Sequence, residues 1–566
     1  MKKPEPKRTL LAGFCLLVLL SCQKKNDAPT HDAIEAINLK RGEVVICGTQ
    51  QPQFGSVRFA VSAPGKTRED FNLAMALLHS FEYDEAEKVF AGIIDKSPDF
   101  AMAYWGVAMC NYHPLWAPPT PAELEKGTKA VTLAQKLADQ AAPESAYIDA
   151  IARFYQDYPT VDHRTRSRRF ETAMEQIHRQ HPADHEAVVF YALALVATAD
   201  PADKTLARQK KAGALLNGLY QRQPDHPGIV HYLIHAFDSP QLAPLALPAA
   251  RRYASLAPSS AHALHMPSHI FVRLGLWTEC IASNQESVSA ARCYAQSTGI
   301  RGHWDEELHG LDYLMYAHLQ RGDNAQARKQ WAYLQTIREV HPASFKVAYA
   351  FAAIPGRYVL ENRLWPEAAR LKVPSANFSW NDFPWQNALI HYTRLLGWVH
   401  TDRLDSARAE LKTLYRLRQT LLGQKDDYKA NQIQIQILSG EAWILHKEGK
   451  SGQALRQMQA AANLEDKTAK HPVTPGELLP ARELLGDMLL EMNKPREALR
   501  AYEADLQNQP NRFNGLYGAS MAAKQAGDDP KATHYARLLV RLADAGRSDR
   551  AEVKAVRGWL PPDGPL

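Results

Sequence analysis

A repeat of about 34 residues constrains the fold of this 566-residue chain more than any other feature. A unit of this length holds two helices joined by a turn, with small residues where the helices cross and a proline after the second helix. The clearest copy starts at Leu479 and places Gly486, Ala498, Tyr502 and Pro510 at repeat positions 8, 20, 24 and 32. The next small anchor, Ala532, follows Ala498 after another 34 residues.

The same anchors recur along the chain. Near the start, Ala86, Phe90 and Pro98 keep the mutual spacing of the best copy. Further anchors at position 20 are separated by 39 to 47 residues: Cys280, Ala327, Ala368, Ala407 and Ala454. This pattern predicts an all-α superhelical solenoid of tetratricopeptide (TPR) type, with insertions between some hairpins. The alternative is an irregular helical bundle.

Composition supports a folded protein and argues against one class of partner. Hydrophobic residues make up 45% of the chain and charged residues 23%, which is typical of globular domains and not of disordered ones. The formal net charge is +6. No basic stripe with interleaved aromatic residues is present, so we expect no nucleic-acid partner.

The N-terminus carries a processing signal. A cationic start precedes an apolar run at residues 10–20 that is too short to span a bilayer. Ser21 and Cys22 follow, and residues 19–22 resemble a bacterial lipobox, in which Cys22 becomes the lipidated N-terminus. The chain is therefore predicted to be anchored in the bacterial cell envelope, in the outer membrane. An ordinary secretory signal is the alternative.

The rest of the chain divides by composition and by the repeat. Short β-like runs around Val45 and Phe59 are separated by glycine and proline, which predicts an irregular or hairpin cap.

The four cysteines beyond Cys22 permit disulfides in an oxidising compartment, but their spacing does not fix a pair. The predicted segments are a signal peptide (1–21), a flexible tether (22–39), the cap (40–66), N-terminal hairpins (67–260), central histidine-rich repeats (261–380), C-terminal repeats (381–555) and a tail (556–566).

The repeat register places histidines on one inner surface. With Cys280 at position 20, His265 and His269 fall at positions 5 and 9 of the first helix. One repeat earlier, His231 and His235 fall at the same two positions. Residues four apart share one helical face, and packed helices lie about 8–10 Å apart. The four imidazoles are therefore predicted to meet in the groove.

Such a column is able to bind a transition metal. Imidazole pairs suit zinc or iron, and His309 and Asp312 of the next repeat provide reserve ligands. Asp238 or Glu307 would then act as a base in Lewis-acid chemistry. Hydrogen bonding or anion binding, and a purely structural role, remain alternatives. The HExxH pattern of zinc proteases is absent from the sequence.

Other polar residues are predicted to line the concave groove. Arg357, Glu483 and Asp487 take groove-facing positions, and His471 lies in a polar loop that leads into the next repeat. The primary functional prediction is an anchored scaffold that binds a protein, peptide or small ligand in this groove. The alternative is a metal-binding protein or metal-dependent enzyme, and a third possibility is a structural assembly factor whose own loops fill the groove. Whether the chain is an enzyme stays open.

Several stretches of the sequence resemble one family of largely uncharacterised bacterial TPR proteins. They include HYLIHAFDSP with HALHMPSHIFVRLGLW, LHGLDYLMYAHLQRG and VAYAFAAIPGRYVLENRLWPEAA, and together they cover most of residues 55–520. The resemblance implies a TPR fold and marks the histidine pairs as family features, without an established reaction. Ala63 and Phe100 stand where relatives often carry cysteine, so the disulfide that those relatives imply is absent here.

Overall fold

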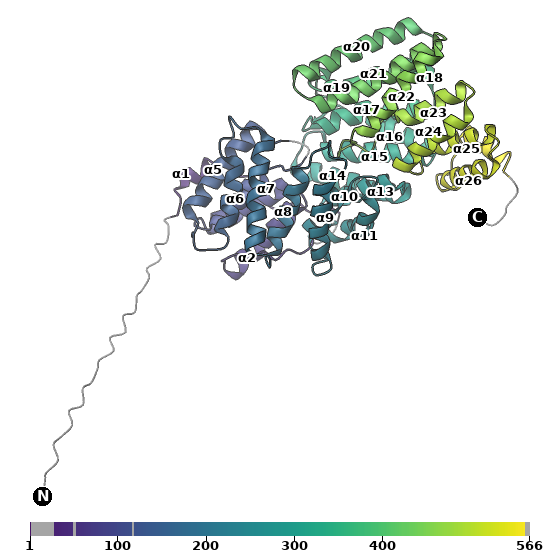
Figure 1. Ribbon diagram of the computed structural model, residues 1–566. Coiled ribbons are helices and arrows are strands. Elements are labelled where there is room, and N and C mark those ends of the chain that lie inside the picture. Colours follow the sequence, from purple (N-terminus) through teal and green to yellow (C-terminus); the bar gives the residue numbers. More distant parts are fainter. Residues whose placement is uncertain (2–27, 49–52, 116–117, 561–566) are drawn as a thin grey trace.

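A computed structural model describes Met1 and residues 28–48, 53–115 and 118–560. The predicted lipidation site Cys22 and the signal peptide lie outside the described residues. Within the described part the protein is an all-α solenoid of TPR-type helical hairpins, as the repeat predicted. Figure 1 shows the purple and blue N-terminal helices on one side of the molecule, teal helices in the middle and green to yellow helices on the other side.

The N-terminal half follows a short first helix, α1 (His31–Glu35). Its hairpins are α2 (Gly65–His79) with α3 (Tyr83–Lys96), α4 (Ala101–Cys110) with α5 (Pro121–Leu137), α6 (Ser145–Tyr155) with α7 (His163–Gln180), α8 (His185–Ala197) with α9 (Ala207–Tyr220), and α10 (Pro227–Phe237) with α11 (Ala243–Leu256). The first helices of successive hairpins pack on one another, and α10 also packs against α2. The stack is therefore strongly curved, and its first helices form the inner wall.

The central helices are interrupted more often. They are α12 (Ala261–His265), α13 (Pro267–Leu274), α14 (Trp277–Thr298), α15 (Asp305–Gln320), α16 (Asn324–Leu334), α17 (Phe345–Glu361) and α18 (Trp365–Ala369). Pro267 begins α13 and separates it from α12, because proline lacks the N–H that would continue the helical ladder. Two short strands, β1 (His303–Trp304) and β2 (Val340–His341), pair in parallel beside α15.

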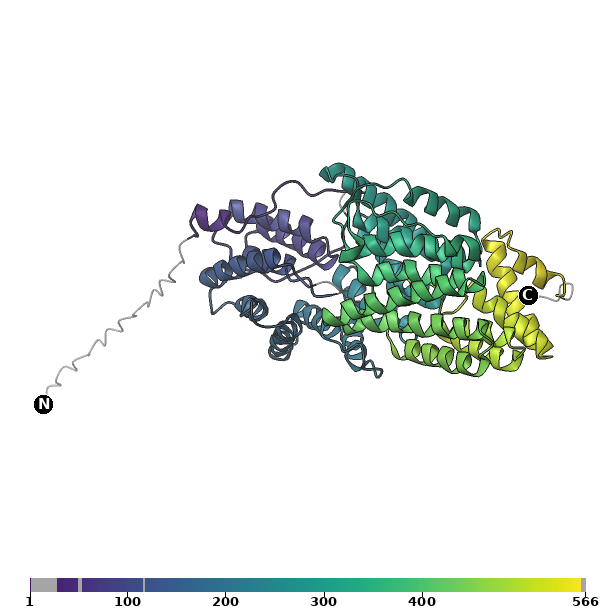
Figure 2. The ribbon, with the colours of Figure 1, turned by 90° about the horizontal axis from the view of Figure 1, so that it is seen from above.

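The C-terminal half returns to regular hairpins after a 3-10 turn, η1 (Trp380–Asp382). The helices are α19 (Pro384–His400), α20 (Leu404–Gly423), α21 (Asp427–Lys447), α22 (Ser451–Lys467), α23 (Ala481–Glu491), α24 (Pro495–Asn508), α25 (Phe513–Gln525), α26 (Asp529–Ala545) and α27 (Ala551–Arg557). Seen from above, the green helices lie side by side as a layered stack, and the yellow C-terminal helices follow at its end (Figure 2).

The anchors of the repeat pack as the sequence predicts. Gly486 on α23 faces the ring of Tyr502 on α24, and a Cβ atom at Gly486 would lie 2.7 Å from that ring. Both residues are buried. The small residue at position 8 therefore makes room for the aromatic residue at position 24, which fixes how the two helices of a hairpin cross.

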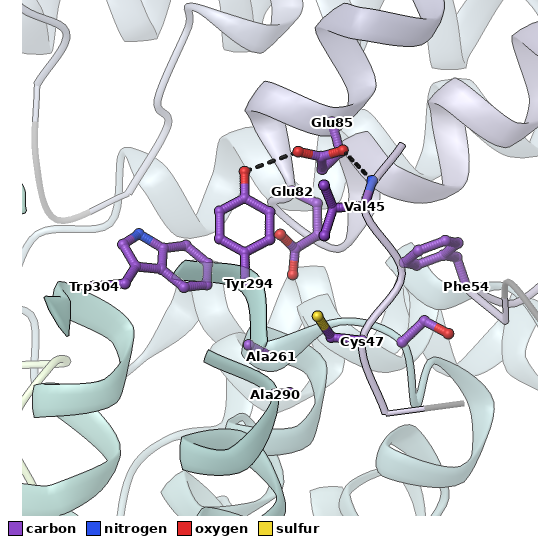
Figure 3. Close-up of a pocket in the computed structure, with 10 residues that line it drawn as sticks. Val45, Cys47, Phe54, Glu82, Glu85, Ala261, Ala290, Tyr294 and Trp304 are labelled. Atoms are coloured by element: carbon purple, nitrogen blue, oxygen red, sulfur yellow. Dashed lines mark hydrogen bonds between the residues drawn. The ribbon is translucent and has the colours of Figure 1, made fainter. Parts of the chain in front are cut away.

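The N-terminal cap is irregular, and the hairpin alternative is wrong for its described residues. The segments around Val45 and Phe59 contain no strand. A disulfide joins Cys47 to Cys293 of α14. Glu85 of α3 accepts hydrogen bonds from the backbone N–H of Val45 and from the hydroxyl of Tyr294, each 2.8 Å long (Figure 3). The cap is thus fastened to two hairpins by side chains and not by sheet pairing.

The C-terminal end of the predicted tether is packed against the solenoid. Ile37 and Leu39 are buried against the first hairpins, and the backbone N–H of Lys40 donates to Glu87 at 2.7 Å. These apolar side chains are part of the core, so the solenoid begins before residue 40. Within the described residues, no helix is both long and apolar enough to cross a lipid bilayer.

A buried ion-pair network connects the central and C-terminal repeats. Arg512 pairs with Glu361 at 2.8 Å and with Glu483 at 3.0 Å, and all three side chains are inaccessible to solvent or nearly so. Arg512 also donates to the hydroxyl of Tyr316 at 2.9 Å. Because the two carboxylates are buried, they depend on this one guanidinium for charge compensation.

Replacing this guanidinium should destabilise the protein strongly. We expect Arg512→Met to lower the free energy of unfolding by about 3–5 kcal/mol, because Glu361 and Glu483 then remain buried without a cation, and Glu361 keeps only the amide donors of Gln320 and Asn514. Chemical denaturation monitored by circular dichroism measures the change. Arg408→Met is the matched control, since Arg408 pairs with Asp405 and Glu448 at the surface. Equal losses in the two variants would contradict the proposed role of the buried network.

Candidate metal centre

Four inner helices bring six histidines together. His231 and His235 come from α10, one helical turn apart. The other four lie on the next two first-helix segments and on α15: His262, His265, His269 and His309. Five of the six are buried, and His235 is partly exposed.

The six rings form two groups of three. In the first group, triad A, the Nε2 atom of His231 lies 3.0 Å from Nε2 of His235 and 3.2 Å from Nε2 of His262. In the second, triad B, Nε2 of His265 lies 3.1 Å from Nε2 of His269. The ring of His309 completes triad B, with its centroid 4.1 Å from that of His265. In each triad, one nitrogen from every ring lies within 4.8 Å of the others.

Hydrogen bonds behind the rings orient them. Nδ1 of His231 lies 2.7 Å from the backbone oxygen of His79. Nδ1 of His265 lies 2.7 Å from Oδ1 of Asn284, whose amide nitrogen donates to another carbonyl. Since these partners are acceptors, each Nδ1 carries the proton and each Nε2 presents a lone pair.

A carboxylate orients a third ring in the same way. Nδ1 of His269 lies 3.2 Å from Oδ2 of Asp238, so it donates to an acceptor that carries a full negative charge. A carboxylate or carbonyl that receives the outer N–H of an imidazole is the usual support of a histidine metal ligand. Three of the six histidines therefore have the outer partner that metal ligands have.

The distances between the Nε2 atoms fit coordination to one ion. Two lone pairs that face each other at about 3 Å repel unless a proton or cation lies between them. Zinc–nitrogen bonds of about 2.0–2.1 Å in a tetrahedral arrangement separate two ligand atoms by about 3.3 Å. Two nitrogen pairs of triad A and one of triad B are near this spacing, and three ligands leave a fourth coordination position for another ligand.

Burial keeps the imidazoles in the neutral form that binds metals. It lowers the pKa of His231, His235, His262, His265 and His309 well below the ordinary value, and the neighbouring imidazoles lower it further. Burial also lowers the pKa of His269, although its hydrogen bond to Asp238 acts in the opposite direction. Protons therefore compete weakly for these nitrogens at neutral pH.

Aromatic rings cover the triads on the sides that face the protein. Phe81 packs against triad A, with its ring centroid 4.4 Å from that of His231 and 5.6 Å from that of His262. Tyr313 packs against triad B, 4.6 Å from His265. These contacts exclude water from the inner sides of the site and restrict the rotation of the imidazoles.

A third group of ionisable residues contains two histidines whose ring nitrogens all have hydrogen-bond partners. His79 and His226 each contact a different oxygen of the buried Glu186, at 3.0 and 2.7 Å. Nδ1 of His226 accepts from the backbone N–H of Ile229, and Nδ1 of His79 lies 3.0 Å from the hydroxyl of Tyr232. No lone pairs are forced together here, so hydrogen bonding alone explains this group.

The sequence predicted most of the histidines of the two clusters but not their grouping. His231, His235, His265, His269 and His309 do come together, yet in two triads instead of one shared site. His262 completes triad A, and the repeat register places it at position 2 of the first helix, which also faces the groove. The reserve ligand Asp312 lies outside both triads and pairs with Arg357 at 3.3 Å.

Neither predicted base is free to act as one. Glu307 already receives hydrogen bonds from Arg292, His303 and Tyr333, so it is fully engaged outside the triads. Asp238 orients His269 and also pairs with Arg273 at 2.8 Å. Burial alone would raise the pKa of Asp238, but Lys470 and Arg273 hold it well below the ordinary value.

The predicted open groove is filled by the chain itself. Arg357 is buried and donates to the backbone oxygens of Gly476 and Glu477, at 2.7 and 2.6 Å. Glu483 is buried beside Arg512. The segment 468–480 therefore occupies the concave surface, which the sequence prediction assigned to a partner.

The two remaining groove residues are also engaged within the protein. His471 packs against Phe345 and Trp385, with ring centroids 4.7 and 5.5 Å away. Asp487 accepts from the hydroxyl of Tyr502 at 2.6 Å and pairs with Arg363 at 2.9 Å. These contacts hold adjacent repeats together and do not present a docking surface.

A cavity of about 300 Å³ remains beside the histidines. His235 and Asp238 contribute to its N-terminal wall, together with Arg273. Lys470, which pairs with the same Asp238 at 4.0 Å, also lines the cavity, and the lining continues through Glu465 and Glu477. The cavity is thus polar, is bounded by both halves of the solenoid, and includes one member of triad A in its lining.

The fold and the site define a TPR-type solenoid with two histidine triads on its inner wall. No family model matches the chain, and no curated protein matches it. Among solved structures, the human IFIT1 dimer with m7Gppp-AAAA is 12% identical over 86% of this chain and 92% of that chain, with a TM-score of 0.35. The APC/C hetero-tetramer Cut9–Hcn1 is 12% identical over 87% of this chain and 96% of that chain, with a TM-score of 0.28. Such distant likenesses carry no argument about a site or a ligand.

Acid should destabilise the metal-free protein because of the triads. Their pKa values are lowered in the folded state, so below about pH 6.5 the unfolded chain binds more protons than the folded chain. Stability is then complete above this pH and falls on acidification by about 1.4 kcal/mol per pH unit for each histidine that stays neutral. Urea unfolding of metal-free protein between pH 5 and 8 measures this slope.

A single substitution provides the control for this measurement. His265→Phe should reduce the pH slope by the contribution of one proton, while the titration of all other groups remains in both proteins. If the variant and the wild type show the same slope, the His265 imidazole is not held neutral by its surroundings.

Proposed function

We propose that the protein is a metal-binding protein in which each histidine triad holds one divalent transition-metal ion through Nε2 atoms. The observation that supports this most strongly comes from triad B, where the Nε2 lone pairs of His265 and His269 converge at 3.1 Å while Asn284 and Asp238 accept from the outer nitrogens. Zinc, iron and copper all accept imidazole ligands. The proposal concerns binding in the folded protein and does not depend on which of these metals is used.

The coordination number favours a reactive site over a structural one. Structural zinc sites have four protein ligands, whereas catalytic sites have three and leave a position for water or substrate. Each triad provides three ligands, and His235 borders the polar cavity. We therefore propose that the cavity binds a small polar molecule that reaches the metal of triad A, as in a metal-dependent enzyme.

This proposal replaces the open groove with an enclosed ligand site. The cavity volume suits a small molecule and not a folded partner or a long peptide. Lys470 is buried in its wall, and burial lowers the pKa of this ammonium group to about 8, against the opposing effect of Asp238. A bound anionic group would find Lys470 and Arg273 beside it on one side of the cavity.

Metal analysis of the untagged protein tests the proposal. We expect about two metal ions per chain after purification without chelators, and a higher melting temperature with metal than without it. His235→Ala should lose about one ion because it removes a ligand of triad A, and His269→Ala should lose one because it removes a ligand of triad B. Elemental analysis by mass spectrometry gives the stoichiometry.

His400→Ala is the matched control for these variants. His400 is a partly buried histidine that packs between Trp365 and Trp443, far from either triad in the repeat order. It should retain both ions. Wild-type protein that contains no metal and whose melting temperature does not respond to added zinc, iron or copper would refute the proposed function.

We further propose that Cys22 anchors the protein to the bacterial envelope, in the outer membrane. The lipobox-like sequence before Cys22 supports this, and the Cys47–Cys293 disulfide is consistent with an oxidising compartment outside the cytosol. Acyl chains on Cys22 would hold the solenoid at a membrane surface.

Lipid labelling tests the anchor. Cells that express the full chain with a labelled fatty acid should yield labelled protein in the membrane fraction. Cys22→Ala should remove the label and release the protein from membranes, because the acylated residue is lost. Cys15→Ala, in the apolar run just upstream, should change neither property. Label that persists in Cys22→Ala would exclude this residue as the anchor.

A further inference from the structure

The two triads are connected through helix α12. Helix α12 provides one residue to each, His262 to triad A and His265 to triad B, three positions apart on one helical face. Across the gap between α10 and α13, the ring centroid of His235 lies 6.3 Å from that of His269. The triads therefore lie next to each other at two places, and helix α12 carries one histidine of each.

Metal–ligand bond lengths can be compared with the distance between the two triads. An ion bound to Nε2 lies about 3 Å from the centroid of each ring that ligates it, given bonds of about 2.0–2.1 Å. His235 belongs to triad A and His269 to triad B, and their rings are separated by only about twice that length. If the open positions of both ions face this contact, a ligand held in the fourth position of one ion also reaches the other ion.

Charge gives a reason for the two ions to share a ligand. Six neutral imidazoles supply no negative charge, so two dications would bring four positive charges into a mostly buried site. Burying uncompensated charge is costly. Asp238 offsets little of this, because Arg273 at 2.8 Å and Lys470 at 4.0 Å already pair with it. Lys346 pairs with both Glu306 and Asp305, at 2.5 and 3.1 Å, so these two carboxylates leave at most one negative charge near the site.

We propose that the two triads form one dinuclear centre, in which both metal ions share a bridging hydroxide. This inference rests on the proposed function, since it requires an ion in each triad. A water molecule that enters through the cavity binds both ions and loses one proton to solvent, and the remaining hydroxide donates one lone pair to each ion. Metal ions lower the pKa of bound water enough for this step at neutral pH.

The bridge defines the class of molecule that the cavity admits. Two-metal sites stabilise oxygen atoms that attack or leave, and they hold substrates through oxygen donors. A small molecule with an anionic oxygen group would displace or accept the hydroxide at the centre. Lys470 and Arg273, which line the adjacent cavity, would attract that charge.

Electron paramagnetic resonance of the copper-loaded full chain tests the bridge. Copper(II) is the probe because imidazole sites bind it tightly and each isolated ion contributes one unpaired electron. The first equivalent should give a signal that accounts for all bound copper. The second should abolish most of the signal, because a shared hydroxide couples the two spins. Copper content is measured on the same samples.

Two variants make the result specific. His231→Ala combined with His235→Ala removes triad A, so the remaining copper should be a single ion with its full signal. His400→Ala, the control variant described above, should lose its copper signal at the second equivalent, as the wild type does. Circular dichroism and melting temperatures establish that each variant is folded.

The possible failures are distinct. Two bound copper ions with a fully integrated signal, whether sharp or broadened, would overturn the bridge and leave two separate metal sites. Protein that binds no copper would overturn the bridge and the proposed function together. Loss of signal in the variant without triad A would also overturn the inference, because coupling would then not require that triad.

Discussion

A contact between a glycine and an aromatic ring, at several places where neighbouring helices cross, constrains the rest of this structure. Gly486 and Tyr502 show it most clearly, since only a residue without a side chain leaves space for that ring. The contact fixes the crossing of two helices, and stacking then fixes which face of each first helix points inward. The histidines converge because their positions in the repeat are equivalent. The clustering of histidines on the inner wall is thus a consequence of repeat geometry.

Local sequence rules were sufficient for the fold and for the choice of residues on the inner wall. A 34-residue period placed His231 above His265 and His235 above His269 without any knowledge of coordinates. The grouping into triads depended on tertiary features that the period does not contain. Pro267 separates α12 from α13, and this break sets how His262 and His265 stand relative to His269. His309 joins them from another hairpin, at a distance set by side-chain packing.

Long-range partners account for the predictions that were wrong or incomplete. The repeat predicted groove-facing positions for Arg357 and Glu483, but their exposure depended on whether another part of the chain covers them. The backbone oxygens of Gly476 and Glu477 accept from Arg357, and Arg512 pairs with Glu483. The partner of Cys47 was equally inaccessible to sequence reasoning, because Cys293 is 246 residues away. Ile37 and Leu39 were assigned to a tether because their burial requires helices that come later.

The same disulfide has a topological consequence. It closes a covalent ring that contains five of the six triad histidines, from His231 to His269, and leaves only His309 outside. Separation of the cap from α14 therefore cannot release the N-terminal hairpins from the helices that carry these ligands. In an oxidising environment this ring limits how far the helices that carry the histidines can separate in a partly unfolded chain. The triads therefore reassemble from a segment whose two ends, Cys47 and Cys293, are already joined.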